Sequence, residues 1–257
     1  MSGNNNIVHF VGAGPGAPDL ITVRGAELLK QAQVVVYAGS LVNPALLDYS
    51  PNAEVFNSAK MTLEEIVDVI KTHYEQGLRV VRLHTGDPSL YGAVREQMDE
   101  LEKLGIPYDS CPGVTACFAA AASLDLEYTL PEISQSLIVT RMAGRTAVPE
   151  RESIESFAAH GASMAVYLSA GMLDELSQRL IAGGYKGTTP AAIVYKASWP
   201  DEKKILCTVE ELGAAGRENG ITKTAVVLVG GAIAKSDYAK SRLYAADFST
   251  EFREASK

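Results

Sequence analysis

The stretch Val11-Gly12-Ala13-Gly14-Pro15-Gly16-Ala17-Pro18-Asp19 decides how the chain begins to fold. It starts at the end of an apolar, β-branched run (residues 7–12), which is typical of a buried strand. Three glycines within five residues permit positive φ angles and let a ligand approach bare backbone. A strand followed by a glycine-rich turn and then a helical pattern predicts that the chain opens with an α/β unit.

Working outward from this stretch, short apolar runs alternate with segments of helical periodicity. Leu63, Ile66 and Ile70 fall on one helical face, and Thr62 with Glu65 has the spacing of a capping box; Thr208 with Glu211 repeats that spacing. The alternation predicts an α/β fold with mostly parallel sheets flanked by helices. The expected strands are 7–12, 34–37, 78–83, 137–141, 164–169, 191–195 and 225–230.

The length of 257 residues corresponds to one large or two modest domains at about 150 residues each. The Ala-rich stretch 116–122 gives way to Leu130-Pro131, after which a new strand begins. We therefore expect an N-terminal α/β domain over 1–130, a C-terminal α/β domain over 131–240 and a polar tail over 241–257.

Composition and charge exclude several classes of protein. The chain is 47% hydrophobic, which is too apolar for a disordered body, yet no apolar run reaches the ~18–20 residues of a membrane span. Its net charge of −8 argues against broad nucleic-acid binding. Its three cysteines form no CxxC motif and predict reduced thiols in a cytoplasm, and no cluster of residues predicts a metal site.

Two further loops follow expected strands. Gly86-Asp87-Pro88-Ser89-Leu90-Tyr91-Gly92 comes after 78–83. Pro112-Gly113-Val114-Thr115-Ala116 comes at the end of the next strand along the chain and precedes the Ala-rich helix. Asp87 could accept a hydrogen bond from a ribose hydroxyl or an amine, or it could cap the next helix with Pro88 at the first position. Ligands collect at the carboxyl ends of strands in open α/β sheets, so three such loops predict one ligand-binding rim.

A dinucleotide site is one alternative for the first loop, because Gly12, Gly14 and Ala17 fit the pattern GxGxxG/A. Pro15 and Pro18, however, lack the N–H donors that a pyrophosphate needs. The second strand also ends in Tyr37-Ala38-Gly39, without the acid that would hold a ribose. A simple tight turn and an NAD-dependent dehydrogenase both remain open on this pattern alone.

In their order and spacing, GAGPG-x-PDLIT, GDPSLYG and PGVTA resemble the tetrapyrrole methyltransferases that use S-adenosylmethionine. The stretches YAGSLV (37–42), KASWPDEK (196–203) and 224–230 are similar to the group within that family that methylates C11 of precorrin-4 or cobalt-precorrin-4 in cobalamin biosynthesis. The resemblance covers about residues 7–234.

The resemblance implies two α/β domains with cofactor and substrate in the trough between them, and a homodimer. It implies S-adenosylmethionine as methyl donor and S-adenosylhomocysteine as product. Carried over position by position, the implied cofactor-binding residues are Pro15, Gly86, Asp87, Leu90, Thr115, Ala116, Leu168 and Ala197.

One position departs from part of the family. Members that methylate uroporphyrinogen have an aspartate, a proposed base, where this chain has Ala38, whereas the match at Lys60 is retained. The resemblance therefore leaves Lys60 as the candidate catalytic residue; a solvated lysine before the Thr62 cap is the alternative.

The implied substrate is a small-molecule tetrapyrrole with several carboxylates, so a protein of net charge −8 needs local cations to bind it. We expect Gly14 and Gly16 to let backbone approach the substrate. Trp199 could cover a planar ring or lie in a core, and His84 is the one histidine near the GDP loop. The candidate cations are Arg82, Arg95, Arg141, Arg145 and Lys196.

The leading hypothesis is methyl transfer to C11 of precorrin-4 or cobalt-precorrin-4. The alternatives are methylation of another tetrapyrrole carbon, and a non-catalytic sensor of nucleotide or tetrapyrrole. A sensor would bind S-adenosylmethionine without producing S-adenosylhomocysteine.

Overall fold

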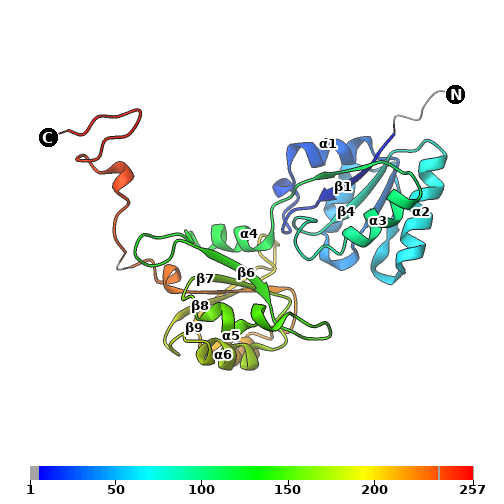
Figure 1. Ribbon diagram of the computed structural model, residues 1–257. Coiled ribbons are helices and arrows are strands. Elements are labelled where there is room, and N and C mark those ends of the chain that lie inside the picture. The colour runs from blue at the N-terminus through cyan, green and yellow to red at the C-terminus, as the bar shows by residue number, and fades with distance from the viewer. Residues whose placement is uncertain (1–5, 237, 257) are drawn as a thin grey trace. The chain divides into compact units, whose positions relative to one another are not determined.

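The computed structural model describes residues 6–236 and 238–256, and these form two compact units. The first contains the chain up to Ala120 together with Lys196–Glu202, and the second contains Ala121–Tyr195 and the chain from Lys203 onward. The chain thus leaves the second unit after Tyr195, contributes seven residues to the first, and returns. Figure 1 shows the two units, with most of their helices and several of their strands labelled.

The first unit is built on a five-stranded parallel sheet in the order β3-β2-β4-β1-β5. Because all the strands run the same way, their carboxyl ends lie along one edge of the sheet. The bounds of the strands are β1 Val8–Gly12, β2 Val34–Tyr37, β3 Glu54–Asn57, β4 Val80–His84 and β5 Tyr108–Cys111.

Helices cover both faces of this sheet, and alternate strand residues supply both cores (Figure 1). One core packs residues such as Phe10 and Val36 against α2 (Leu63–Glu75) and α3 (Arg95–Lys103). The opposite core packs Val11, Val35 and Leu83 against α1 (Val23–Gln31) and the 3-10 helix η3 (Pro44–Tyr49). Strands buried on both faces read as continuous apolar runs, which is why the sequence revealed β1, β2 and β4.

Of the two expected capping boxes, one forms. Thr62 Oγ1 accepts from the Glu65 amide, and the Glu65 carboxylate accepts from the Thr62 amide at 2.8 Å, which starts α2. Thr208 and Glu211 also bond, at 2.8 and 2.9 Å, but α7 begins only at Leu212. This second pair therefore stabilises the turn between β9 and α7 rather than a helix start.

The second unit contains a mixed sheet in the order β6-β7-β10-β8-β9, in which only β6 and β7 are parallel neighbours. The α/β fold class is confirmed, but this sheet is not mostly parallel. The core lies between the sheet and helices α5 (Ile154–Ala158), α6 (Leu173–Ala182) and α7 (Leu212–Glu218). Its strands are β6 Leu137–Arg141, β7 Ser163–Tyr167, β8 Pro190–Tyr195, β9 Lys203–Thr208 and β10 Ala225–Val229.

The Ala-rich helix α4 spans Ala116–Ser123 and carries the chain from the first unit into the second. No helix in the described ranges is long and apolar enough to cross a membrane.

Candidate active site

Three loops meet at the carboxyl edge of the parallel sheet, because β4, β1 and β5 are adjacent strands. The loop after β1 and the loop after β4 are joined by a two-way backbone bridge: the Gly14 amide donates to the Gly86 carbonyl at 3.2 Å, and the Gly86 amide donates to the Gly14 carbonyl at 2.8 Å. The loop after β5 is joined to the GDP loop by the Gly113 amide, which donates to Asp87 Oδ2 at 2.9 Å.

The contact between these loops leaves no room for side chains. A Cβ on Gly12 would lie 2.6 Å from the Gly113 Cα, and a Cβ on Gly113 would overlap the Gly86 carbonyl oxygen. Gly14 also has a φ of +76°, a conformation that glycine adopts without strain. The rim therefore consists of closely packed bare backbone.

Asp87 organises this rim with its side chain. Besides the Gly113 amide, its carboxylate accepts from the Ser89 amide at 2.9 Å and from the Ser89 hydroxyl at 2.5 Å. Burial alone would raise the pKa of Asp87, but these hydrogen bonds outweigh it and hold the pKa below its usual range. The idea that Asp87 caps the next helix is wrong, because α3 begins only at Arg95.

A segment from the second half of the chain completes the glycine-rich loop. The Trp199 indole donates to the Pro15 carbonyl at 3.0 Å, and the Ala17 amide donates to Ser198 Oγ at 3.0 Å. A Cβ on Gly16 would overlap the Trp199 ring. Gly16 is therefore required for the approach of Trp199, and this side chain lies against the loop rather than in a hydrophobic core.

The other residues that the resemblance assigns to the cofactor lie as follows. Leu90 is half-buried in the GDP loop, and Thr115 and Ala116 are half-buried at the start of α4. Ala197 is buried in the segment that joins the first unit. Leu168 follows β7 in the second unit, where it is 67% exposed with a φ of +54°.

Arg82 corrects one expectation about the candidate cations. It was expected to bind a substrate carboxylate, but it is only 3% exposed and its guanidinium bonds inside the first unit. Burial lowers its pKa to about 10, so it still carries a charge at neutral pH. The sequence placed Arg82 near a strand end correctly; it could not show that the side chain turns into the core.

Two other candidate cations have acidic partners. Arg95 bonds to Asp99 and to Glu102 on the exposed face of α3, at 2.6 and 2.7 Å. Lys196 bonds to Asp201 at 2.6 Å and lies 5.2 Å from the centre of the Trp199 ring. These pairs neutralise much of the charge that a tetrapyrrole carboxylate would use.

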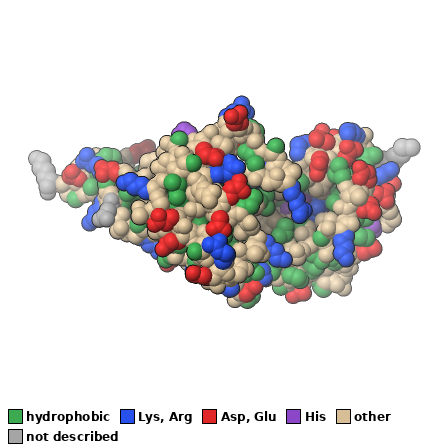
Figure 2. All heavy atoms as spheres, turned by 90° about the horizontal axis from the view of Figure 1, so that it is seen from below, with side chains coloured by type: hydrophobic (Ala, Val, Ile, Leu, Met, Phe, Trp, Pro, Cys, Tyr) green, Lys and Arg blue, Asp and Glu red, His purple; other side chains and the backbone are tan. Residues whose placement is uncertain are grey.

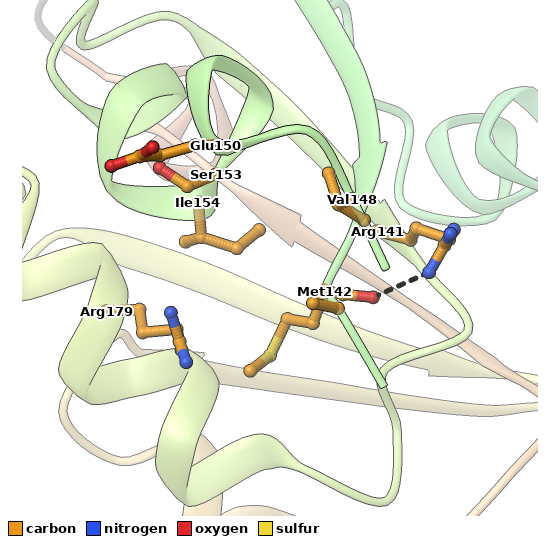
Figure 3. A pocket seen from close by; sticks show the side chains of 8 residues that line it. Arg141, Met142, Val148, Glu150, Ser153, Ile154 and Arg179 are labelled. Atoms are coloured by element: carbon orange, nitrogen blue, oxygen red, sulfur yellow. Dashed lines mark hydrogen bonds between the residues drawn. The ribbon is translucent and has the colours of Figure 1, made fainter. Parts of the chain in front are cut away.

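Arg141 lies at the carboxyl end of β6 and shapes the loop that follows. Its guanidinium donates to the carbonyls of Met142, Thr146 and Ala147 at 3.1, 3.2 and 2.8 Å. Figure 3 shows this group folded back onto Met142, while the Met142 thioether points toward Arg179. The cavity beside it has a volume of about 230 Å³ and is lined by Arg141, Met142, Ala143, Val148, Glu150, Ser153, Ile154 and Arg179.

Lys60 and Arg145 are exposed cations. Lys60 ends the short 3-10 helix η4 (Ser58–Lys60), which follows β3 at the same edge of the sheet as the three loops. Arg145 lies in the loop that Arg141 holds. On the face shown in Figure 2, basic and acidic side chains are interspersed.

His84 ends β4 directly beneath the GDP loop and is only 4% exposed. Burial lowers its pKa to about 3, and the charge of Arg82 contributes to the shift, so the ring is neutral. Its Nε2 atom has no hydrogen-bond partner in the described part of the chain. In the same described ranges, no group of three or more His, Cys, Asp or Glu side chains could hold a metal ion.

Comparison with known proteins now identifies the family. Residues 7–213 match the family described as "Tetrapyrrole (Corrin/Porphyrin) Methylases". The chain is 50% identical over 255 residues to the cobalt-precorrin-4 C(11)-methyltransferase of Methanocaldococcus jannaschii, covering 99% of this chain and 98% of that protein.

Two solved structures are similar as well. The X-ray structure of a cobalamin biosynthetic enzyme, cobalt precorrin-4 methyltransferase, has a TM-score of 0.86 and 47% identity, covering 88% of this chain and 95% of its own. The uroporphyrin-III C-methyltransferase of Thermus thermophilus, solved with S-adenosylhomocysteine, has a TM-score of 0.74 and 27% identity. This match covers 89% of this chain and 93% of that chain.

The chain belongs to the tetrapyrrole methylase family. It is an S-adenosylmethionine-dependent C-methyltransferase, as the resemblance in its three loops implied.

Some residues that build the site were not predicted from the sequence. Gln97 has no local motif, because its partner Arg82 lies on another element. Ser198 lies within KASWPDEK, but nothing in that stretch shows that its hydroxyl accepts from the Ala17 amide. Gly113 was visible within PGVTA, but only the structure shows that its amide bonds to Asp87.

Gly16→Ala tests the contact with Trp199. The added methyl overlaps the indole, so Trp199 must move and lose its bond to Pro15. We expect a red-shifted emission and a loss of about 1–3 kcal/mol in the free energy of unfolding. Trp199 is the only tryptophan, so intrinsic fluorescence reports on this contact directly. Gly144→Ala, whose Cβ would meet only Met172 at 3.7 Å, serves as the control and should leave emission unchanged.

Acid should loosen the rim through Asp87. Because its pKa is lower in the folded than in the unfolded chain, its contribution to stability is full above the unfolded value of about 3.9 and is lost as the pH falls through the folded value. In urea unfolding from pH 6 downward, the free energy of unfolding should therefore fall more steeply for the natural protein than for Asp87→Asn. If the difference in free energy of unfolding between the two proteins does not change with pH, Asp87 does not have this role.

Proposed function

We propose that this protein transfers a methyl group from S-adenosylmethionine to C11 of precorrin-4 or cobalt-precorrin-4 in cobalamin biosynthesis. The observation that carries the proposal is the 50% identity, over nearly the whole of both chains, to a protein named for this reaction. The three joined loops that carry the motifs of the resemblance support it, because their geometry depends on glycines that this chain retains.

We propose that the rim of the first unit holds the methyl donor. The residues fit such a ligand, since the loops pack as bare backbone at the sheet edge, and none of residues 12–19, 85–92 and 112–116 is a lysine or arginine that would repel a sulfonium. The proposed contacts in this unit are Pro15, Gly86, Leu90, Thr115, Ala116 and Ala197; the resemblance also implies Leu168, which belongs to the second unit. Asp87 has its carboxylate committed to Gly113 and Ser89, so its part is to fix the loops.

The proposed chemistry asks mainly for alignment from the protein. When bound, the donor supplies a methyl group on a sulfonium, which is already a good leaving group. The rim's contribution is to hold the acceptor carbon and the methyl group in line, at about 3–3.5 Å, and to exclude water. A rim of backbone groups fixed by Asp87 and Trp199 suits this task, because it has little freedom to rearrange.

For the tetrapyrrole we propose binding by exposed cations, and Lys60 and Arg145 are exposed candidates. Gly14, Gly16, Arg141 and Lys196 stay candidates for substrate contact, although each also has a structural partner. Arg82 is removed from this set by its burial. Ala38 offers no carboxylate at the position of the base proposed for uroporphyrinogen methylation, which favours a precorrin acceptor.

We further infer a homodimer acting in the cytoplasm. The dimer rests on the family resemblance. The compartment is supported by the three cysteines, Cys111, Cys117 and Cys207, which are not joined in a disulfide.

Mass spectrometry tests the proposed reaction. Incubation with S-adenosylmethionine and either precorrin-4 or cobalt-precorrin-4 should add one methyl group at C11 of one or both, and should release S-adenosylhomocysteine. Calorimetry should show that S-adenosylhomocysteine binds. Binding without any turnover would favour the sensor hypothesis, and methylation at a different carbon would overturn the assignment of C11.

The cations are tested by Lys60→Met and Arg145→Met. Losing one well-placed charge should cost about 1.5–3 kcal/mol, seen as a raised KM for the tetrapyrrole, while the affinity for S-adenosylhomocysteine stays within twofold. A fall in kcat at unchanged KM for Lys60→Met would instead indicate the catalytic role. Lys103→Met is the control, because Lys103 is paired with Glu100 on α3. Equal KM values in all variants would contradict binding by these cations.

A further inference from the structure

A chain of buried polar contacts runs beneath the GDP loop. Arg82 on β4 and Gln97 on α3 are 3% and 4% exposed. The Arg82 Nε donates to Gln97 Oε1 at 2.8 Å, and its Nη1 donates to the Val36 carbonyl on β2 at 3.1 Å. The Gln97 Nε2 then donates to the Ala93 carbonyl at 3.0 Å. The contacts thus connect two strands of the sheet to the far end of the loop.

The loop itself, residues 86–94, has a conformation that needs support. Tyr91 and Ala93 have φ values of +56° and +49°, in the left-handed region that side chains disfavour. Gly92 packs so closely that a Cβ there would overlap the Pro88 carbonyl. Such a conformation persists only where the surrounding contacts determine it.

The two ends of the loop are held differently. At its start, Gly86 is bridged to Gly14, and Asp87 bonds to Gly113. At its end, the Ala93 carbonyl accepts from Gln97, whose other end is fixed by Arg82. Leu90, a proposed cofactor contact, lies between these anchors.

We propose that Arg82 and Gln97 are positioning residues for the methyl donor: they fix residues 88–94 in the conformation that binds it. This inference rests on the proposed cofactor site. An arginine suits the position because its planar fork reaches Gln97 and Val36 together, which the single ammonium of a lysine does not reproduce. Burying the Arg82 charge costs free energy. The charge lies where it fixes the Gln97 side chain, and Gln97 in turn fixes the end of the loop.

Gln97→Glu separates positioning from packing. The glutamate keeps an acceptor for Arg82 but replaces the donor to the Ala93 carbonyl with an oxygen that repels it. We expect a melting temperature close to that of the natural protein, faster hydrogen exchange at the amides of residues 89–94, and a Kd for S-adenosylhomocysteine raised at least tenfold. The KM for the tetrapyrrole should change less than twofold.

Arg82→Met provides a second, independent variant. It removes the buried charge and leaves an apolar side chain of similar length, a replacement that buried sites often tolerate. Gln97 then loses its fixed partner, so we expect the same two effects, smaller in size: faster exchange at 89–94 and a Kd raised about threefold or more. Arg79→Met is the matched control, because Arg79 donates to the Gln31 carbonyl just before β4 begins, away from the loop.

The outcomes are distinct. Exchange at 89–94 and affinity for S-adenosylhomocysteine both unchanged in Arg82→Met, or in a folded Gln97→Glu, would overturn the positioning role. If Gln97→Glu does not fold, the exchange and affinity measurements on Arg82→Met alone test the positioning role. If the natural protein does not bind S-adenosylhomocysteine, the proposed function fails. The support that Arg82 and Gln97 give to residues 88–94 is tested independently of this result, because unchanged hydrogen exchange in the two variants would overturn it.

Discussion

The first unit depends on one constraint: three loops approach one another at the sheet edge with no side chains between them. Gly12, Gly86 and Gly113 supply the bare backbone, and a methyl group on Gly12 or Gly113 would collide with its neighbour. Because the loops are in direct contact, one carboxylate, that of Asp87, suffices to join two of them. The rim thus consists of close-packed backbone around one carboxylate, whose hydrogen bonds are made within the rim itself.

The parts of the fold that the sequence predicted are those with the strongest burial. β1, β2 and β4 are buried on both sides, so their sequences are mainly apolar, although β1 contains His9 and β4 contains Arg82 and His84. The strands predicted with residue bounds did not include β3, β5 or β9. All three are edge strands, and Cys111 is their one fully buried residue, so they lack that signal. The antiparallel pairing of β8 with β9 and β10 was also missed, because strand direction depends on the connections rather than on the apolar pattern.

The site was predicted unevenly for a related reason. The loops could be recognised because glycine, proline and aspartate in a fixed order are local features. The cations could not be sorted, because Arg82, Arg95 and Arg145 look alike in sequence, yet one is buried, one is paired with two acids and one is exposed. A net charge describes the whole chain, whereas binding depends on which few charges have no partner nearby.

The segment Lys196–Glu202 has a consequence for how the protein is made. The glycine-rich loop lies near the N-terminus, yet Pro15 and Ala17 find their partners in Trp199 and Ser198, which the ribosome adds much later. A nascent chain can assemble its first sheet as soon as β5 has emerged, but its rim stays incomplete until the strands up to β8 have followed. The rim is therefore completed late in synthesis, at a point when more than half of the second unit has been translated.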